Sequence, residues 1–451
     1  MTRYLVAGVG IAGTAAARAL ARHGHEVVVY NRDDDEALTA LKDIAQRVVC
    51  GPITTDLFDG VGQVVVSPGF PPDHELALAA SDLGLEVYSE PELAWRLRPA
   101  GAAPWLAVTG TNGKTTTVTM LAAILTAAGL RTAALGNIGV PLVDAVDADH
   151  DVLAVELSSQ QLHWSHRLAP QVGAILNLAD DHLSWHGGFD AYAGAKTAIW
   201  RGGVCVGNAD DPLVHARLDD TAGRHVEFTL AEPAGGQLGV VDGVMVDRTG
   251  DDPVELCPVD RVRPAGRHNL ANALAAATVA REFGVPAEAV RDGLTGYVPE
   301  PHRNVEIARV GEVRYVDDSK GTNPHATAAA LAEYDPVVWI AGGQLKGVDV
   351  EPLVAQAAPR LRGAVLLGTD RDVLAAALRR HAPTVPVVVI DRADPEAMDE
   401  VVFAAADLAR PGDTVLLSPA GASYDMFTGY PDRGRRFAAA VTRLSDTAAP
   451  R

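Results

Sequence analysis

The stretch Gly110-Thr-Asn-Gly-Lys114-Thr115-Thr116 indicates the fold most directly. It follows the apolar run Leu106–Val108 and precedes a long segment rich in Ala, Leu and Thr, so we expect a strand, a loop and a helix in that order. Such a loop supplies what a triphosphate needs: backbone N–H groups, an ammonium group and a hydroxyl for magnesium. Val108 takes the place of the first glycine of a full Walker A motif. The order of the elements still predicts an α/β domain that binds ATP.

A second glycine-rich loop, Gly8-Val-Gly10-Ile-Ala-Gly13, lies between a strand ending at Ala7 and a helix expected to begin near Thr14. Glycines at this spacing let backbone N–H groups approach a diphosphate at the start of a helix. A nicotinamide site would add an acidic residue at the end of the second strand, about 20 residues further on. That strand ends at Tyr30-Asn31-Arg32 instead. The loop therefore predicts a diphosphate site at Gly10 and Gly13 without indicating NAD, and a tight turn that binds nothing is the alternative.

The length of 451 residues corresponds to about three domains. Short apolar runs alternate with helical segments along the whole chain, which is typical of parallel sheets covered by helices. We predict an α/β fold of three consecutive domains: Rossmann-like over 1–97, P-loop ATPase-type over 98–299, and Rossmann-like over 300–451. Pro-rich segments at Arg98–Pro104 and Tyr297–Arg303 mark the two boundaries.

Apolar runs predict the strands of each domain. Between 225 and 260, Val-rich stretches separated by Gly and Asp turns predict short antiparallel strands. The other expected strands, of which those after residue 300 should be buried, are Tyr4–Ala7, Val27–Tyr30, Val64–Val66, Val152–Val155, Ala174–Leu176, Val337–Ile340, Ala364–Leu367, Val387–Ile390 and Thr414–Leu417.

Composition excludes several classes of protein. With 38 Lys and Arg against 58 Asp and Glu, the net charge of −20 argues against nucleic-acid binding and against a basic membrane-docking surface. The sequence shows neither a signal peptide nor an apolar run of roughly 18 residues, so we expect a cytoplasmic protein without a membrane anchor. We also expect a monomer. Cys50, Cys205 and Cys257 lie far apart, which predicts three small buried side chains and no disulfide or zinc site.

Polar residues follow two of the predicted central strands. Glu156 closes one strand and is followed by Ser158-Ser159, while Asn177, Asp180, Asp181 and His182 follow the next. Because the carboxyl ends of parallel strands meet at one edge of a sheet, these residues predict a metal and substrate site beside the phosphate loop. Lys196 lies in a helical segment, and on propensity alone it is an exposed helix lysine.

Together, these motifs resemble the Mur ligases, ATP-dependent amide ligases of peptidoglycan precursor synthesis. The matching segments, which run in order along the chain, are Gly110–Thr116, Asn137-Ile-Gly139, Glu156-Leu-Ser-Ser159, Asn177 with Asp181-His182, Lys196, Gly266-Arg-His-Asn269-Leu-Ala-Asn272, His302-Arg303 and Asp318-Ser-Lys320. The third domain resembles the D-glutamate-adding branch, on the segments Lys320-Gly-Thr322-Asn323, Gly342–Gly347 and Leu417–Phe427.

The resemblance implies a role for each matched residue. The implied catalytic residues are Lys114, His182 and Lys196. The implied ATP contacts are Gly110, Thr111, Asn112, Gly113, Lys114, Thr115, Thr116, Asn269, Asn272, Arg303, Asp318 and Lys320. The implied substrate contacts are Gly10, Gly13, Asn137, Ser158, Thr322, Lys346, Ser418 and Phe427. The implied ligands of two magnesium ions are Thr115, Glu156, His182 and Lys196, the last as a carbamate formed with carbon dioxide.

The resemblance also implies a reaction. The substrates would be UDP-N-acetylmuramoyl-L-alanine and D-glutamate, joined through an acyl phosphate in cell-wall synthesis, on which cell shape and division depend. Arg303 and Lys320 would reach the central domain only after a hinge near residue 299 closes. An acidic chain must then gather several anions, and Lys114, Arg303, Lys320, Lys346 and magnesium would form the positive cluster that does so.

Three other functions are alternatives to this ligase reaction. A nicotinamide oxidoreductase built on the first domain would leave residues 110–116 unexplained. A nucleotide-sensing module would bind ATP without phosphate release that depends on an amino acid. A folylpolyglutamate synthetase would share the pattern of the central domain but not a first domain that binds a UDP group.

Overall fold

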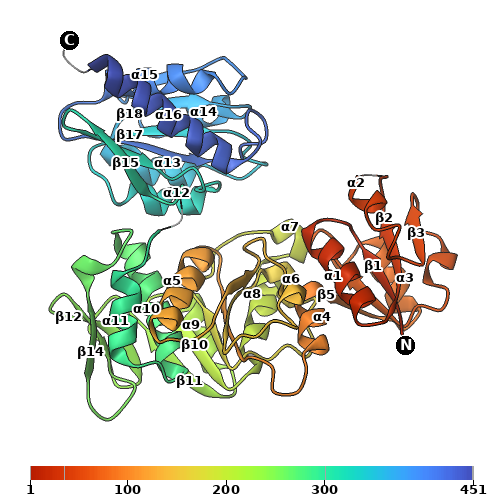
Figure 1. Cartoon of the computed structure of the whole chain (residues 1–451). Coiled ribbons are helices and arrows are strands. Elements are labelled where there is room, and N and C mark those ends of the chain that lie inside the picture. The colour runs from red at the N-terminus through yellow and green to blue at the C-terminus, as the bar shows by residue number, and fades with distance from the viewer. Residues whose placement is uncertain (1, 35, 300, 449–451) are drawn as a thin grey trace. The chain divides into compact units, whose positions relative to one another are not determined.

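The computed structural model describes residues 2–34, 36–299 and 301–448, whose strands form three main sheets (Figure 1). The sheets belong to two compact units. The first unit runs up to Ala265 and includes Asn269–Tyr297, and the second comprises Gly266–His268 and the chain from Val298 onward. The predicted α/β class with three Rossmann-like or P-loop sheets is confirmed. The predicted hinge lies near residue 299. The next residue, Glu300, is the first of the predicted third domain, and Glu300 lies outside the described residues.

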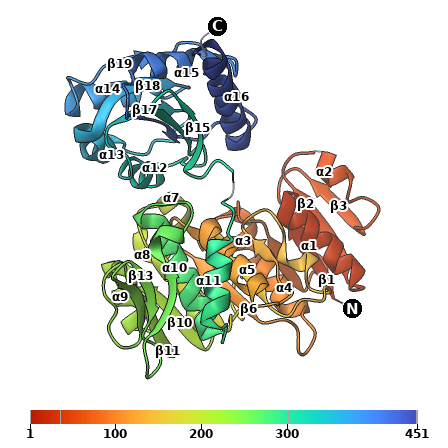
Figure 2. The ribbon, with the colours of Figure 1, turned by 60° about the vertical axis from the view of Figure 1, so that its left-hand side comes forward.

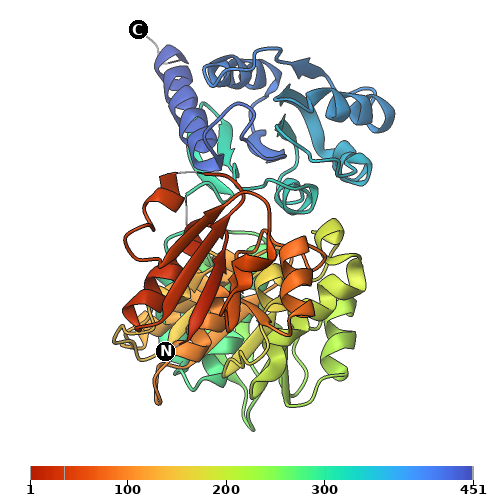
Figure 3. The same ribbon diagram turned by 90° about the vertical axis from the view of Figure 1, so that its right-hand side faces the viewer.

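The N-terminal sheet has five parallel strands in the order β3-β2-β1-β4-β5 (Figure 3). Successive residues of a strand point to opposite faces. Val6 therefore packs with helices α1 and α4, whereas Leu5 packs with α3. The elements are β1 (Arg3–Ala7), α1 (Ile11–Arg22), β2 (Glu26–Asn31), α2 (Glu36–Thr39), β3 (Arg47–Cys50), the 3-10 helix η1 (Thr55–Phe58), β4 (Gln63–Val66), α3 (Glu75–Asp82), β5 (Glu86–Ser89) and α4 (Glu90–Leu97).

The central sheet has nine strands in the order β14-β13-β12-β11-β10-β9-β6-β8-β7. One face is covered by α5 (Lys114–Ala127), α10 (Arg267–Glu282) and α11 (Ala287–Thr295), as Figure 2 shows. The other elements are β6 (Trp105–Thr109), β7 (Ala134–Gly136), η2 (Leu142–Asp144), β8 (Leu153–Glu156), α6 (Ser159–His163), β9 (Val172–Ile175), α7 (Leu183–His186), α8 (Phe189–Thr197), η3 (Ala198–Arg201), β10 (Val204–Asn208), α9 (Pro212–Asp219), β11 (Arg224–Phe228), β12 (Gln237–Val241), β13 (Val244–Asp247), β14 (Val254–Pro258) and η4 (Val259–Arg261).

The sheet of the second unit has the order β15-β16-β20-β17-β18-β19. Its strands are parallel except for the antiparallel β15–β16 pair. The elements are β15 (Val305–Val310), β16 (Val313–Asp317), α12 (Pro324–Leu331), β17 (Val337–Gly342), α13 (Glu351–Ala357), η5 (Ala358–Arg360), β18 (Leu361–Leu367), α14 (Arg371–His381), β19 (Val387–Val389), α15 (Ala397–Leu408), β20 (Thr414–Ala420) and α16 (Tyr430–Ala448).

Four local predictions are wrong. Helix α1 begins at Ile11, before Thr14, because Gly10 already serves as its N-cap. Strand β11 is parallel to β10, so the antiparallel strands begin only with the β12–β13 pair. Strand β19 is only partly buried because it lies at the edge of the sheet and has a neighbouring strand, β18, on one side only. Cys50 is exposed at the end of the edge strand β3, although Cys205 and Cys257 are buried as predicted.

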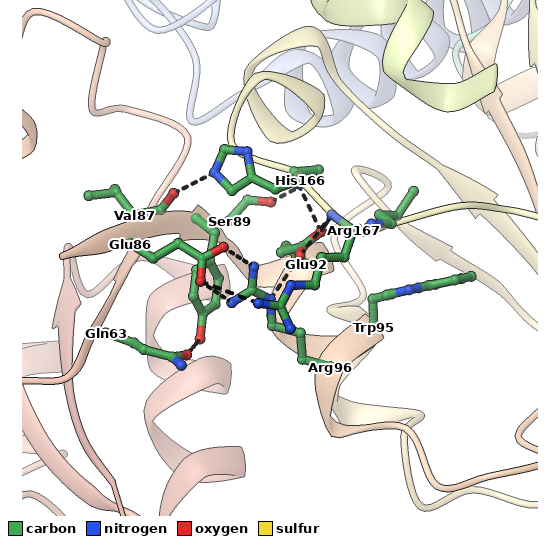
Figure 4. A network of polar contacts seen from close by, with 12 residues as sticks. Gln63, Glu86, Val87, Ser89, Glu92, Trp95, Arg96, His166 and Arg167 are labelled. Atoms are coloured by element: carbon green, nitrogen blue, oxygen red, sulfur yellow. Dashed lines mark hydrogen bonds and ion pairs between the residues drawn. The ribbon is translucent and has the colours of Figure 1, made fainter. Parts of the chain in front are cut away.

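A polar network joins the N-terminal sheet to the central one, and Figure 4 shows its core. The fully buried carboxylate of Glu92 accepts the backbone N–H groups of His166, Arg167 and Leu168 at 2.9–3.1 Å. It also accepts a bond from Arg96 Nε at 2.8 Å. The three backbone N–H groups belong to the segment before β9, so their bonds to Glu92 join the N-terminal sheet to the central one, whereas the bond from Arg96 lies within α4.

Glu90 lies in the same helix as Glu92 and also bonds to the central part of the chain, and its burial predicts a dependence of stability on pH. The Oε1 atom of the Glu90 carboxyl group accepts the backbone N–H of Val143 at 2.7 Å. Burial, opposed by this bond and reinforced by the charge of Asp144, raises the pKa of Glu90 to about 8. The folded protein therefore keeps a proton on Glu90 that the unfolded chain releases, and this bound proton stabilises the folded state. The stabilisation is full below the ordinary pKa of a glutamate and is lost as the pH rises through about 8.

Glu90→Gln keeps an oxygen for Val143 but cannot ionise. We expect equal stability of the variant and the wild type near pH 4, and a variant more stable by at least about 2 kcal/mol at pH 8, since each pH unit contributes about 1.4 kcal/mol. Urea unfolding at the two pH values measures this difference. Glu255→Gln, at an exposed position, is the matched control. Parallel stability profiles for Glu90→Gln and the wild type would contradict the assignment.

In the part of the chain that the structure describes, no helix combines the length and the apolar character needed to cross a membrane.

Candidate active site

The phosphate loop follows the carboxyl end of β6, and α5 begins at Lys114, as the sequence predicts. Gly113 is the N-cap residue, with φ of 83°, and a Cβ there would overlap the side-chain oxygen of Asn272. Glycine is therefore needed for both conformation and space. The loop is held by Asn177, whose Oδ1 accepts Asn112 N–H at 2.8 Å and whose Nδ2 donates to Asn112 O at 3.1 Å. The predicted ATP residues Asn112, Gly113 and Asn272 thus lie together.

Two lysines meet at this loop. Lys114 Nζ donates to the carbonyl oxygens of Gly110 and Thr111 at 2.9 and 2.8 Å. Lys196 Nζ, from α8, donates to the same Gly110 oxygen at 2.8 Å and to Thr109 Oγ1 at 3.3 Å. One carbonyl oxygen thus accepts bonds from both amines, which places Lys196 beside the phosphate loop.

The sequence interpretation of Lys196 as an exposed helix lysine is wrong. Its side chain is 1% exposed and lies against the Tyr192 ring, with Nζ 4.8 Å from the ring centroid. Burial, together with the charge of Lys114, holds the pKa of Lys196 well below its ordinary value. The neutral amine is thereby favoured, and a neutral amine is a nucleophile.

Glu156 closes β8, and its carboxylate is buried beside the loop. Thr115 Oγ1 donates to Glu156 Oε2 at 2.6 Å, and Asn137 Nδ2 donates to Glu156 Oε1 at 2.9 Å. These oxygen atoms are the hard ligands that magnesium prefers, and this ion commonly takes few protein ligands and completes its shell with water and phosphate oxygens. Among the described residues no group of three His, Cys, Asp or Glu side chains is placed to hold a metal. Thr115 and Glu156 supply oxygen atoms of the kind that magnesium takes, and their role as magnesium ligands stays a prediction.

Some of the predicted central residues line one pocket of about 340 Å³, whereas Thr115, Glu156, Asn177 and Asp180 do not line it. It is lined by Pro68, Gly69, Lys114, Asn137, Ser158, Ser159, Gln160, Asp181, His182, Tyr192 and Lys196. All three predicted catalytic residues are in this set, with the predicted substrate residues Asn137 and Ser158. The side chain of His182 is about half exposed, and its Nε2 lies 3.5 Å from Asp181 Oδ2.

Sequence reasoning missed Pro68, Gly69, Gln160 and Tyr192 as lining residues. Pro68 and Gly69 follow β4, so their position after the carboxyl end of a parallel strand could have indicated them. Tyr192 lies one helical turn before Lys196, and its hydroxyl is 2.8 Å from Thr111 Oγ1. Burial raises the pKa of Tyr192 above its ordinary value, so the hydroxyl keeps its proton and can bond to the loop.

The first glycine loop is closely packed on one side and open on the other. A Cβ at Gly13 would overlap the carbonyl oxygen of Gly8, and Gly8 itself has φ of 87°. By contrast, a Cβ at Gly10 would meet no atom within 4 Å. Gly10 is the N-cap residue of α1, so the open side presents the start of a helix, where backbone N–H groups favour anions.

In the second unit, Asp318 and Ser418 meet at the carboxyl ends of β16 and β20. Ser418 Oγ donates to Asp318 Oδ2 at 2.6 Å. Burial, opposed by this bond, raises the pKa of Asp318 to about 7. Lys320 lies in the same loop as Thr322, between β16 and α12. Its Nζ atom is 5.1 Å from the centroid of the Tyr430 ring.

The remaining predicted residues are spread over both units. Lys346 adopts φ of 54° in the loop after β17, and Phe427 is 6% exposed within the apolar core that α15 and α16 form with the sheet. A contact between the Phe427 ring and an amino acid therefore stays a prediction. In the first unit, Asn269 Nδ2 donates to Ala265 O at 3.0 Å. Arg303 follows His302, whose Nδ1 lies 2.6 Å from Asp317 Oδ2.

Comparison with known families shows which family this chain belongs to. Residues 2–89 match the Mur ligase MurD-like N-terminal domain, residues 108–280 the Mur ligase middle domain, and residues 302–421 the Mur ligase glutamate ligase domain. The chain belongs to the Mur ligase family. A Mur ligase accounts for the phosphate loop, and the match over residues 2–89 adds the first domain that a folylpolyglutamate synthetase would lack.

Relatives of this Mur ligase extend over its whole length. It is 53% identical to the UDP-N-acetylmuramoylalanine–D-glutamate ligase of Thermobifida fusca, with 98% of each chain covered. It is 52% identical to the enzyme of the same name from Streptomyces coelicolor, with 97% of each covered. Among solved structures, it resembles a pseudomurein peptide ligase type C from Methanothermus fervidus, at a TM-score of 0.59 and 18% identity over 98% of this chain and 100% of the other. It also resembles the UDP-N-acetylmuramate-alanine ligase of Thermotoga maritima, at 0.57 and 19% over 99% and 100%. These two likenesses show the fold.

Proposed function

We propose that this Mur ligase joins D-glutamate to the alanine carboxyl of UDP-N-acetylmuramoyl-L-alanine while converting ATP to ADP and phosphate. The observation that carries the proposal is the pocket in which Lys114, His182 and Lys196 meet beside the phosphate loop. Full-length relatives at 52–53% identity, which are named for this reaction, support the choice of amino acid and nucleotide sugar. Fold likeness alone would not select one Mur ligase reaction from another.

Each of the three predicted domains would bind one of the three substrates. Residues 1–97 would bind the UDP diphosphate at the open side of Gly10, residues 98–299 would bind ATP, and residues 300–451 would bind D-glutamate. The family matches over 2–89, 108–280 and 302–421 support this division. The monomeric state and the cytoplasmic location stay predictions.

The chemistry requires that a carboxylate become an electrophile. In the proposed reaction, an oxygen of the alanine carboxylate attacks the γ-phosphorus of ATP, the bond to the β-phosphate oxygen breaks, and an acyl phosphate and ADP form. The amine of D-glutamate then attacks the acyl carbon, phosphate leaves, and the amine loses a proton. Negative charge gathers on phosphoryl oxygens in the first step, so Lys114 would act by preorganised electrostatic stabilisation.

Magnesium and the modified lysine belong to the proposal. Thr115 and Glu156 would bind one magnesium ion, which supplies charge neutralisation at the phosphates when bound. His182 and a carbamate on Lys196 would serve a second ion. The burial of Lys196 and its lowered pKa support this role, because carbon dioxide reacts with neutral amines and the product is an anionic oxygen ligand.

The reaction is tested by measuring phosphate release from ATP with UDP-N-acetylmuramoyl-L-alanine and a panel of amino acids. We expect release only when D-glutamate is present, because each Mur ligase must place the attacking amine at the acyl carbon. L-glutamate, L-lysine and diaminopimelate are the controls. Release with L-lysine or diaminopimelate would move the protein to a sister reaction, and ATP binding without release would favour the nucleotide-sensing module.

A further inference from the structure

The segment Ser67–Phe70 contacts two parts of the proposed substrate site. Ser67 Oγ donates to Gly8 O at 3.2 Å, and a Cβ at Gly8 would lie 3.0 Å from a ring carbon of Phe70. The two residues between them, Pro68 and Gly69, line the pocket that holds Lys114 and Lys196. One segment of the N-terminal sheet therefore touches both the first glycine loop and the wall of the central pocket.

Two tryptophans from the central part of the chain hold this segment. Trp164 Nε1 donates to Phe70 O at 3.1 Å, and Trp185 Nε1 donates to Pro68 O at 3.1 Å. Both indole rings pack with the apolar cluster that Leu5 and the residues around it form in the N-terminal sheet, and Trp164 is only 9% exposed. Each indole thus packs its apolar ring with the core of one sheet, Trp164 within it and Trp185 against it, and bonds its N–H group to the segment.

Trp185 is also linked to a second lining residue of the pocket, Ser159, through His186. Its ring packs on His186 at 4.4 Å between centroids, and His186 Nε2 lies 3.0 Å from Ser159 Oγ, which lines the pocket. The His186 ring packs in turn on Tyr192 at 5.4 Å. Burial lowers the pKa of His186 to about 4, so the imidazole is neutral at physiological pH. Trp185 is therefore linked to Pro68 directly and to Ser159 through His186.

We propose that Trp185 and Trp164 are positioning residues that set the affinity for the nucleotide-sugar substrate. By fixing Ser67–Phe70, they fix the distance between the first glycine loop and the pocket that holds Lys114 and Lys196. A substrate that binds at both places then needs no rearrangement of the protein to reach them. Preorganisation of this kind improves binding because less freedom is lost when the ligand binds. The inference rests on the proposed function, since it takes one ligand to extend from Gly10 to the pocket.

The test replaces each indole by a ring without an N–H group, in Trp185→Phe and Trp164→Phe. We expect the KM for UDP-N-acetylmuramoyl-L-alanine to rise about fivefold in each variant, the usual effect of one lost hydrogen bond. The KM values for ATP and D-glutamate and the kcat should change by less than about twofold, because neither indole touches the reacting atoms. Calorimetric titration of the same nucleotide sugar without ATP should show the same loss of affinity.

Trp95→Phe is the matched control, because Trp95 packs on Trp105 and Arg98 and not on the segment. Thermal melting establishes that the variants fold, and the substrate-induced change in tryptophan fluorescence, which should be smaller in Trp185→Phe than in Trp95→Phe, gives a second measurement. Unchanged KM values for the nucleotide sugar, or equal changes for all three substrates, would overturn the inference. A wild-type protein that neither binds UDP-N-acetylmuramoyl-L-alanine nor releases phosphate would overturn the proposed function instead.

Discussion

Lys114→Ala should reduce D-glutamate-dependent phosphate release by about a thousandfold or more, the effect expected when a preorganised charge is removed from a developing phosphoryl anion. In the structure, Lys114 Nζ lies over its own loop, bonded to the oxygens of Gly110 and Thr111. The ammonium group is thus held where a triphosphate would approach the N-terminus of α5. The measurement is kcat/KM for ATP at saturating concentrations of the other two substrates.

Lys42→Ala is the control for this substitution, since it removes an exposed lysine of the N-terminal sheet and should leave phosphate release unchanged. Lys114→Arg separates charge from geometry. Because a guanidinium group is planar and larger than an ammonium group, the arginine variant should also be strongly impaired. Retention of more than about a tenth of the wild-type activity in Lys114→Ala would remove this residue from the phosphate site.

Local patterns were enough to predict the strands and loops that build the site. A strand, a glycine-rich loop and a helix around Gly110–Thr116 need only neighbouring residues, and the structure has them in that order. Glu156 closes its strand for the same reason, because an apolar run followed by a polar residue marks the end of a buried strand. These features depend on short-range sequence, and the α/β class followed from them.

Long-range packing decides what the local patterns could not predict. Lys196 bonds to Gly110, 86 positions earlier, and Trp185 bonds to Pro68, 117 positions earlier. Helix propensity describes each of these residues as part of an ordinary helix, since it contains no information about the partner across the fold. Only the resemblance to a family indicated Lys196, and no signal indicated Trp185. The exposure of β19 likewise depends on its place in the order of the sheet.

Lys196→Ala should be nearly inactive and should recover part of its activity when a short-chain carboxylic acid is added. The reason lies in the surroundings of the amine, which is 1% exposed and bonded to Gly110 O and Thr109 Oγ1. A protonated lysine at this depth would repel magnesium, whereas a carbamate would bind it. Burial and Lys114 hold the pKa of Lys196 well below its ordinary value, which favours the reactive neutral form relative to an ordinary lysine.

The comparison that decides this point is between Lys196→Ala and Lys114→Ala, both assayed with and without acetate or propionate. Phosphate release should fall by at least about a hundredfold in each. Only the Lys196→Ala cavity, which opens beside Glu156 and the loop, would accept a carboxylate in place of the lost carbamate, so recovery should be confined to that variant. Equal recovery in both variants would show a general effect of the acid. Full activity of Lys196→Ala without any acid would exclude the carbamate, since the metal would then need no ligand from this position.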